Sequence, residues 1–143
     1  SQGAQHALEI LTSMDVDGIW TSGIDYSVFE QFAVAGVDYV PVVGADNNAF
    51  IEQLMNVDGL TGAGVSNPPS IGGVGAAVAL DILEGKDVPK QTLLTPVVLD
   101  TMDELEGVYV PDLTAGWSSY MVIEPYVTYT DAQAVIDCKG PGE

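Results

Sequence analysis

The sequence predicts an α/β fold, a parallel sheet with helices on both faces. Two observations lead to this class. First, segments whose apolar residues are spaced as on one face of a helix alternate with short apolar segments typical of strands along the first hundred residues. Second, each helix and strand pair takes up about as many residues as one repeat of a right-handed βαβ unit. Such units place successive parallel strands side by side and cover them with helices.

The first predicted helix is followed by a turn at residues 15–18 and a short buried strand at 19–21. We expect Trp20, within that strand, to lie in the core. The alternative for its ring is stacking on the apolar face of a sugar. The helix has an apolar face whose members are spaced three or four residues apart: Ala4, Leu8, Leu11, Met14.

The second predicted helix ends at Gly36, a residue that readily adopts the left-handed conformation of a helix end. A β-branched strand at residues 39–43 follows it. The apolar face of this helix is expected from four residues: Val28, Phe29, Phe32, Ala33.

The third predicted helix centres on residues 50–55, and a strand follows at 62–65. A long helix should then begin after a cap at Ser70 and end at Gly85, before a fourth extended segment at 91–99. Residues 103–107 are expected as a polar turn. The remainder is expected as a tail that wraps the surface, with at most a short helix at 131–136.

The chain is strongly acidic: 21 Asp and Glu residues against three lysines and no arginine give a formal charge of -18. Because nothing here neutralises phosphates, the composition excludes nucleic acid as a partner. The single cysteine, Cys138, excludes an internal disulfide and a cysteine-rich zinc site. No apolar run reaches the roughly 18 residues of a membrane span. If the parent protein is exported, we expect its signal upstream of Ser1.

Polar, turn-forming segments follow the first three predicted strands, at residues 22–25, 44–48 and 66–69. In open parallel sheets the ligand crevice lies beyond the carboxyl ends of the strands. These segments are therefore expected to converge on one edge.

Asp46 is the strongest candidate in this edge, because a carboxylate can accept hydrogen bonds from two neighbouring hydroxyls of a sugar. Asn47 can both donate and accept. Gly23 and Asp25 can bring backbone and carboxylate toward a ligand. Each has an alternative structural role in a turn or a helix cap.

Enzyme signatures are missing from the pattern, so the chain is not expected to be an enzyme. The only histidine, His6, falls on the polar side of the first helix, away from the predicted crevice. The glycine runs at 62–64 and 72–75 do not complete a dinucleotide loop. Residues 15–18 lack the later ligands of a calcium loop. We expect no cofactor and no metal.

Several segments, taken in order, resemble the C-terminal half of type I periplasmic sugar-binding proteins, which serve ABC transporters. The resemblance rests on residues 17–23, 42–48, 67–73, 83–90, 95–99 and 110–113. It implies two α/β lobes of Rossmann-like type, joined by crossing segments, that close on a sugar. Residues 1–66 would be the later part of the C-terminal lobe. Residues 67–100 would return to the N-terminal lobe, and 101–143 would hold a crossing segment and the tail.

Position by position, the resemblance places Asp46 at the carboxylate that binds sugar hydroxyls. Gly23 stands where ribose binders have an asparagine, and Ser66 where they have a glutamine. The implied ligand is a monosaccharide or related polyol. The implied partners are the missing N-terminal half and a membrane permease, and the exposed missing surface implies self-association of the fragment. The implied location is periplasmic or extracellular, with a lipid anchor possible in the parent protein.

Two other classes stay open at this stage. One is a sugar-responsive effector domain of a regulator with the same fold, although no basic helix-turn-helix is present. The other is a small α/β enzyme, although no nucleophile with a base, metal cluster or phosphate loop is visible.

Overall fold

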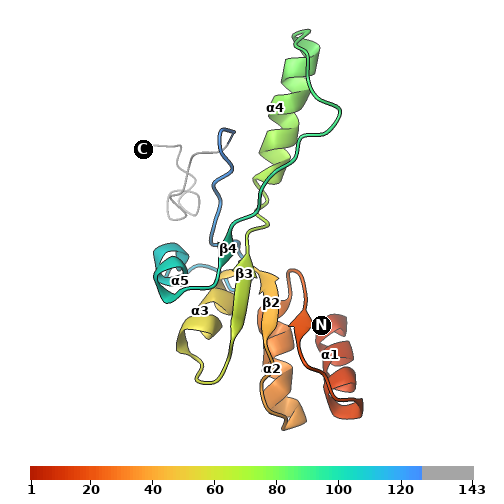
Figure 1. Ribbon diagram of the computed structural model, residues 1–143, viewed down its shortest axis with the longest axis vertical. Helices are drawn as coiled ribbons and strands as arrows, with labels where there is room; N and C mark the ends of the chain where they lie inside the picture. The colour runs from red at the N-terminus through yellow and green to blue at the C-terminus, as the bar shows by residue number, and fades with distance from the viewer. Residues whose placement is uncertain (127–143) are drawn as a thin grey trace.

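The computed structural model describes residues 1–126, in which helices and strands alternate along the chain (Figure 1). In this part of the chain the helices are α1 (Gln2–Ser13), α2 (Asp25–Ala35), α3 (Asn48–Asn56), α4 (Ile71–Leu83) and α5 (Met102–Val108). The strands are β1 (Ile19–Trp20), β2 (Val42–Ala45), β3 (Gly62–Val65) and β4 (Val98–Leu99). The expected α/β class is confirmed. The expected helix at 131–136 lies outside the described residues.

The sheet has the strand order β1-β2-β3-β4, so each strand lies beside the next in the chain. The pairs β1–β2 and β2–β3 are parallel, as the alternation of helices and strands predicts. β4 pairs antiparallel to β3, with Gly64 opposite Leu99. The expectation of a purely parallel sheet is therefore wrong at its last strand, because the segment after α4 returns alongside β3 without crossing over.

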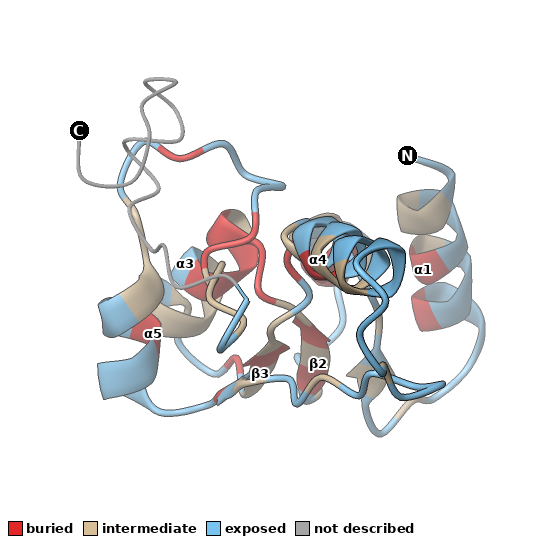
Figure 2. Ribbon diagram, turned by 90° about the horizontal axis from the view of Figure 1, so that it is seen from above, coloured by how far each residue is buried: buried red, intermediate tan, exposed pale blue. Residues whose placement is uncertain are grey.

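Helices cover one face of this sheet, which we call the inner face. Figure 2 shows α1 and α3 on the same side of β2 and β3. The residues that point to this side include Val42 and Leu99, at most 2% exposed. The opposite side carries six apolar residues in two cross-strand rows, and no described helix packs on them. We call this the open face: Trp20, Val43, Ala63, Ala45, Val65, Val98.

The open face corrects two expectations. Cover by helices on both faces is not met among residues 1–126, where the packed helices share the inner face. Trp20 is not a core residue, since 81% of it is exposed. Side chains alternate between the faces of a strand, and Ile19 takes the inward position of β1.

The core lies between the inner face and the helices. One cluster joins α1, α2 and α3 to β2 around the fully buried Phe32, Phe50 and Val42. A second joins α3 to β4 and α5 through Ile51, Leu99 and Leu105. Glycines allow this close packing: a Cβ on Gly64 would press on the Ile51 side chain, and one on Gly62 would overlap the Val42 carbonyl.

The ends of two helices show the local chemistry that sets them. Gly36 takes the left-handed conformation (φ 69°) and closes α2, as expected. The expected turn at 103–107 is instead α5. Thr101 and Glu104 form a capping box there, in which the Thr101 hydroxyl accepts from the Glu104 backbone N–H and the Glu104 carboxylate accepts from the Thr101 N–H.

Residues 67–97, which we call the arm, project from the carboxyl end of the sheet along the long axis of the molecule (Figure 1). The arm consists of α4 and an extended return segment. Only Val74 of α4 is buried, whereas Leu80, Ile82 and Leu83 are 59% to 82% exposed. Ser70 occupies the N-cap position of α4, as expected, but its side chain makes no capping hydrogen bond. Its hydroxyl donates instead to the Met121 carbonyl (2.9 Å).

Strand boundaries also differ from the predicted ones. The β-branched segment at 39–43 enters the sheet only at Val42, and β2 extends to Ala45. Of the extended segment at 91–99, only Val98 and Leu99 pair with a neighbouring strand. The ends of these strands are thus set by where a neighbouring strand offers hydrogen-bond partners, more than by the β propensity of the residues.

Candidate functional site

The loops that follow β1, β2 and β3 meet at one edge of the sheet, as predicted. Residues 21–25, 46–47 and 66–69 leave the carboxyl ends of three adjacent strands. The tail joins them, because Asn47 and Ser118 form an antiparallel bridge. Two buried carboxylates organise this edge.

Asp46 is 1% exposed, and its carboxylate accepts three hydrogen bonds from the protein itself. Oδ1 accepts from the Asn67 backbone N–H (3.0 Å). Oδ2 accepts from the Ser118 hydroxyl (2.6 Å) and from the Tyr120 backbone N–H (2.8 Å). A carboxylate offers about four acceptor positions. Most acceptor positions of Asp46 are therefore occupied by hydrogen bonds that join the loop after β3 to the tail.

Asp25, the first residue of α2, is completely buried. Its Oδ2 accepts from the Gly23 backbone N–H (3.0 Å) and from the Asn47 side-chain amide (2.6 Å). Its Oδ1 has no partner and lies against Gly44, where a Cβ would overlap the carboxylate. Asp25 thus fixes the β1 loop to the β2 loop, and it requires glycine at position 44.

Asn48, which can donate and accept like its neighbour Asn47, also belongs to this edge, and its side chain binds other parts of the chain. Its amide donates to the Val110 carbonyl (2.9 Å), and its Oδ1 accepts from the Val110 N–H (3.1 Å) and the Ser119 hydroxyl (3.0 Å). Tandem asparagines are also ordinary loop residues, so the sequence carries no signal that separates Asn48 from Asn47.

Ser66 holds the two stems of the arm together. Its backbone N–H donates to the Val97 carbonyl (2.9 Å), and its hydroxyl accepts from the Val97 N–H (2.8 Å). The chain therefore leaves β3 and re-enters β4 at nearly the same point. We call this pair of bonds the Ser66–Val97 clasp.

The structure brings the five predicted site residues to one edge, and all five take part in hydrogen bonds that tie its segments together. Gly23, Asp25 and Asn47 are linked directly, Asp46 is the neighbour of Asn47, and Ser66 adjoins the Asn67 that Asp46 holds. Most of their polar atoms bind other parts of the chain. These hydrogen bonds therefore hold the loops in place, and the exposed polar groups that could contact a ligand belong to neighbouring residues of the same loops.

A cavity of about 300 Å³ lies across the ends of β1, β2 and β3, on the open face. Trp20 forms one wall, with its ring mostly exposed. Ser22 and Asn67 are exposed polar residues in the lining, and no charged residue belongs to it. The full lining is Trp20, Thr21, Ser22, Gly44, Ala45, Val65, Ser66, Asn67 and Pro96.

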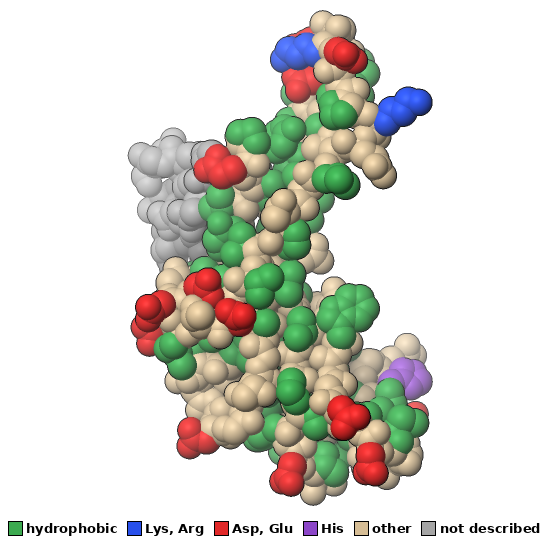
Figure 3. Space-filling model, in the orientation of Figure 1, with side chains coloured by type: hydrophobic (Ala, Val, Ile, Leu, Met, Phe, Trp, Pro, Cys, Tyr) green, Lys and Arg blue, Asp and Glu red, His purple; other side chains and the backbone are tan. Residues whose placement is uncertain are grey.

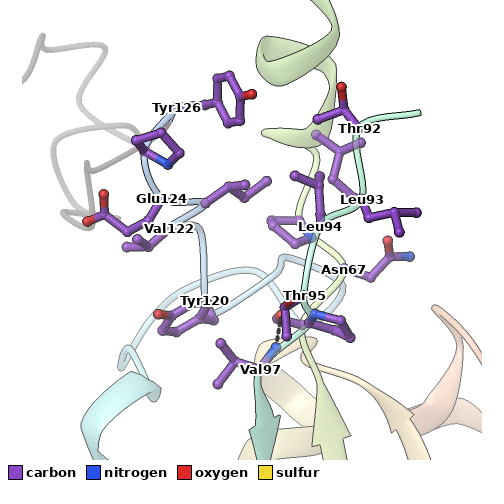
Figure 4. Close-up of a pocket in the computed structure, with 16 residues that line it drawn as sticks. Asn67, Thr92, Leu93, Leu94, Thr95, Val97, Tyr120, Val122, Glu124 and Tyr126 are labelled. Atoms are coloured by element: carbon purple, nitrogen blue, oxygen red, sulfur yellow. Dashed lines mark hydrogen bonds between the residues drawn. The ribbon is translucent and has the colours of Figure 1, made fainter. Parts of the chain in front are cut away.

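A larger hollow of about 710 Å³ lies between the return segment of the arm and residues 120–126. Figure 4 shows Thr92, Leu93 and Leu94 on one side and Tyr120, Val122 and Tyr126 on the other. Its lining is mainly apolar, and its one charged residue, Glu124, is exposed. It has no buried charged group that would orient a polar ligand.

His6 lies where the sequence predicts, exposed on α1 and 3.6 Å from Glu9. Among residues 1–126, no three His, Cys, Asp or Glu side chains gather as they would around a metal ion. Within the same residues no helix is both long and apolar enough to cross a membrane.

Comparison with known proteins adds no identification: no family model, no curated protein and no solved structure matches the chain.

Proposed function

We propose that this chain binds a small neutral polyhydroxylated ligand, a monosaccharide or polyol, as part of the solute-binding component of an ABC transporter. The observation that carries the proposal is the exposed Trp20 ring, which forms a wall of a cavity with an uncharged, partly polar lining. The cavity lies at the carboxyl edge of parallel strands, where open α/β sheets bind ligands.

The chemistry of the lining suits a sugar. An indole ring stacks on the apolar face of a sugar ring. The hydroxyls of Thr21, Ser22 and Ser66 both donate and accept, and the Asn67 amide offers both functions, which matches the mixed demands of sugar hydroxyls. A lining without charged side chains favours a neutral ligand over an ionic one.

The buried network supports this role by fixing the loops that carry these groups. Asp46 holds the backbone of Asn67, and Asp25 holds that of Gly23, next to Ser22. A binding site needs such support, because the productive geometry of its contacts is narrow. Direct contact between Asp46 and a ligand stays a prediction, and it would use the remaining acceptor position of the carboxylate.

The arm supports the proposal of a two-lobed protein. It leaves and re-enters the edge beside the cavity and buries only one residue of its helix. In the proposed protein, residues 1–66 belong to one lobe and the arm, residues 67–97, reaches the other. The chain returns to the first lobe at β4, which pairs with β3, and continues into the tail. The ligand favours the closed state because it contacts both lobes. The closed complex then docks on a membrane permease, on the side of the membrane that faces away from the cytoplasm.

The test is a titration of the polypeptide encoded by the whole gene with neutral monosaccharides and polyols, followed by calorimetry and tryptophan fluorescence. We expect a sugar to bind, and Trp20→Ala to weaken its affinity about tenfold through lost stacking. Trp117→Phe is the matched control, since Trp117 does not line the cavity, and it should leave the affinity unchanged.

Three results would contradict the proposal. These are an absence of binding by every sugar and polyol, a charged ligand that binds in their place, and an unchanged affinity after Trp20→Ala. Small-angle scattering with and without the bound sugar tests the closure, which predicts a more compact complex.

A further inference from the structure

Two apolar surfaces of the described chain have no partner in it: the open face of the sheet and the helix of the arm. The open face has six apolar residues in two rows, with Trp20 81% and Val98 49% exposed. Helix α4 has a single charged residue, Asp81, and exposes Leu80, Ile82 and Leu83. Figure 3 shows apolar side chains both on the arm and on the body below it.

We propose that two copies of this chain associate by exchanging arms, so that the arm of each copy lies on the open face of the other. The exchange is an isologous contact with two-fold symmetry, in which each copy gives one arm and receives one. The inference concerns the 143-residue chain by itself and does not rest on the proposed function. Trp20, Ala45 and Val65 belong both to the open face and to the lining of the cavity, so the arm of a second copy and a sugar compete for them.

The directions of the elements fit this exchange. The arm continues beyond the carboxyl ends of the parallel strands, and α4 runs away from the sheet (Figure 1). A two-fold axis across the long axis reverses the second copy, so α4 runs antiparallel to the β1, β2 and β3 strands that it meets. Helices that cover parallel strands in βαβ units have the same orientation.

The lengths also fit. The 13 residues of α4 extend about 20 Å, whereas the four residues of β2 or β3 extend about 13 Å. One helix is therefore long enough to cover the strands of a partner. Parallel strands are normally buried on both faces, and the exchange supplies the layer that the open face lacks.

The contacts at the base of the arm keep α4 from folding back onto the open face of its own chain. The Ser66–Val97 clasp holds its two stems together, and Ser70 is bonded to Met121. Pro68 and Pro69 stiffen the link between β3 and α4. These contacts direct α4 outward from the end of the sheet (Figure 1). A second copy brings an open face to the helix without breaking them.

Charge favours contact between arm and body over contact between two bodies. Residues 1–66 and 98–126 hold fifteen acidic side chains and no lysine or arginine. The arm holds the two lysines of the described residues, Lys86 and Lys90, against three acidic residues. Lys86 is paired with Asp81 (2.7 Å) and Glu84 (2.9 Å). The nearly neutral arm thus approaches an acidic body with little repulsion.

The first test is the mass of the 143-residue chain in solution, measured by sedimentation equilibrium with reductant present to keep Cys138 reduced. We expect twice the monomer mass of 15.0 kDa. Leu83→Glu on the arm and Val98→Glu on the open face should each raise the dissociation constant at least about tenfold, since each buries a charge. Ile10→Glu is the matched control: it adds the same charge at an exposed position outside both surfaces.

The second test mixes the two variants. A pair formed from one Leu83→Glu copy and one Val98→Glu copy keeps one intact contact, between the unaltered arm of the second and the unaltered face of the first. We expect the mixture to associate more tightly than either variant alone. Circular dichroism verifies that both variants remain folded.

Four outcomes would overturn the exchange. The first is a wild-type chain that stays monomeric at high concentration, and the second is association of both surface variants with the affinity of the wild type. The third is an Ile10→Glu variant that associates as weakly as they do. The fourth is a mixture of the two surface variants that associates no more tightly than either variant alone. The last outcome would indicate contacts between two arms or two open faces.

Discussion

The body of the molecule, residues 1–66 and 98–126, buries its large side chains, whereas the arm leaves most of its own exposed. In the body, Phe32 and Phe50 are fully buried, and even the carboxylates of Asp25 and Asp46 lie inside with hydrogen-bond donors around them. In the arm, α4 buries only Val74 and exposes a series of large apolar residues. Stability of the isolated chain should therefore reside in the body, whereas the arm offers surface for contact with something else.

The largest expected contrast comes from truncating one apolar residue in each region. Phe32→Ala should lower the free energy of unfolding by about 4 kcal/mol, because it opens a cavity in the main core. Leu83→Ala, at a position 82% exposed in the single chain, should change it by no more than about 0.5 kcal/mol at a protein concentration low enough to keep the chain monomeric. Urea unfolding followed by circular dichroism measures both. A large loss from Leu83→Ala would show that the arm packs on the body of its own chain.

The next effect concerns the buried carboxylate that joins the loops. Asp46→Ala should lower the free energy of unfolding by about 3 kcal/mol, because it leaves the Asn67 and Tyr120 N–H groups and the Ser118 hydroxyl without their acceptor. Asp58→Ala, at an exposed position, is the control for removal of one negative charge. Equal stability of the two variants would mean that Asp46 does not support the edge.

The smallest effect tests the capping box of α5. Thr101→Ala should cost about 1 kcal/mol of stability at neutral pH. Hydrogen bonds from the Thr101 hydroxyl and backbone hold the pKa of Glu104 below its usual value. A lowered carboxyl pKa stabilises the fold above the unfolded pKa, and this contribution is lost as pH falls through the folded pKa. The difference between wild type and variant should therefore shrink in acid.

Thermal unfolding across an acidic pH series measures this difference. Thr92→Ala is the control, since Thr92 is an exposed residue of the arm. A gap that stays constant down to strongly acidic pH would contradict the role of ionised Glu104.

Periodicity alone was enough to predict the first four helices and the parallel part of the sheet, because the core of the body selects for an apolar face on each helix. Gly36 was likewise predictable as a helix end, since its role depends on one backbone angle. The Thr101 and Glu104 pair carried an equally local signal that points to a helix start. The polar composition of residues 103–107 predicts a turn instead, and this prediction is wrong because the capping box starts α5 there.

Other features depend on contacts that no local pattern contains. The direction of β4 is set by the return path of the arm, and a two-residue strand reads the same in either direction. A tryptophan within a short apolar strand is expected in the core, but the inward position of β1 belongs to Ile19. The donor Ser118 lies 72 residues from Asp46. The sequence therefore predicted the edge and its residues, but not that these residues bind mostly one another.

The Ser66–Val97 clasp has a topological consequence. Because the chain departs and returns through two adjacent residues, the arm is an insertion that one short link could replace. We therefore expect the body to keep its strand order and its core when the excursion between these residues is shortened or exchanged for another segment. Outside the contacts of Asn67 and Ser70 with the body, the arm should tolerate changes of length and sequence, as a surface point that accepts an inserted domain does.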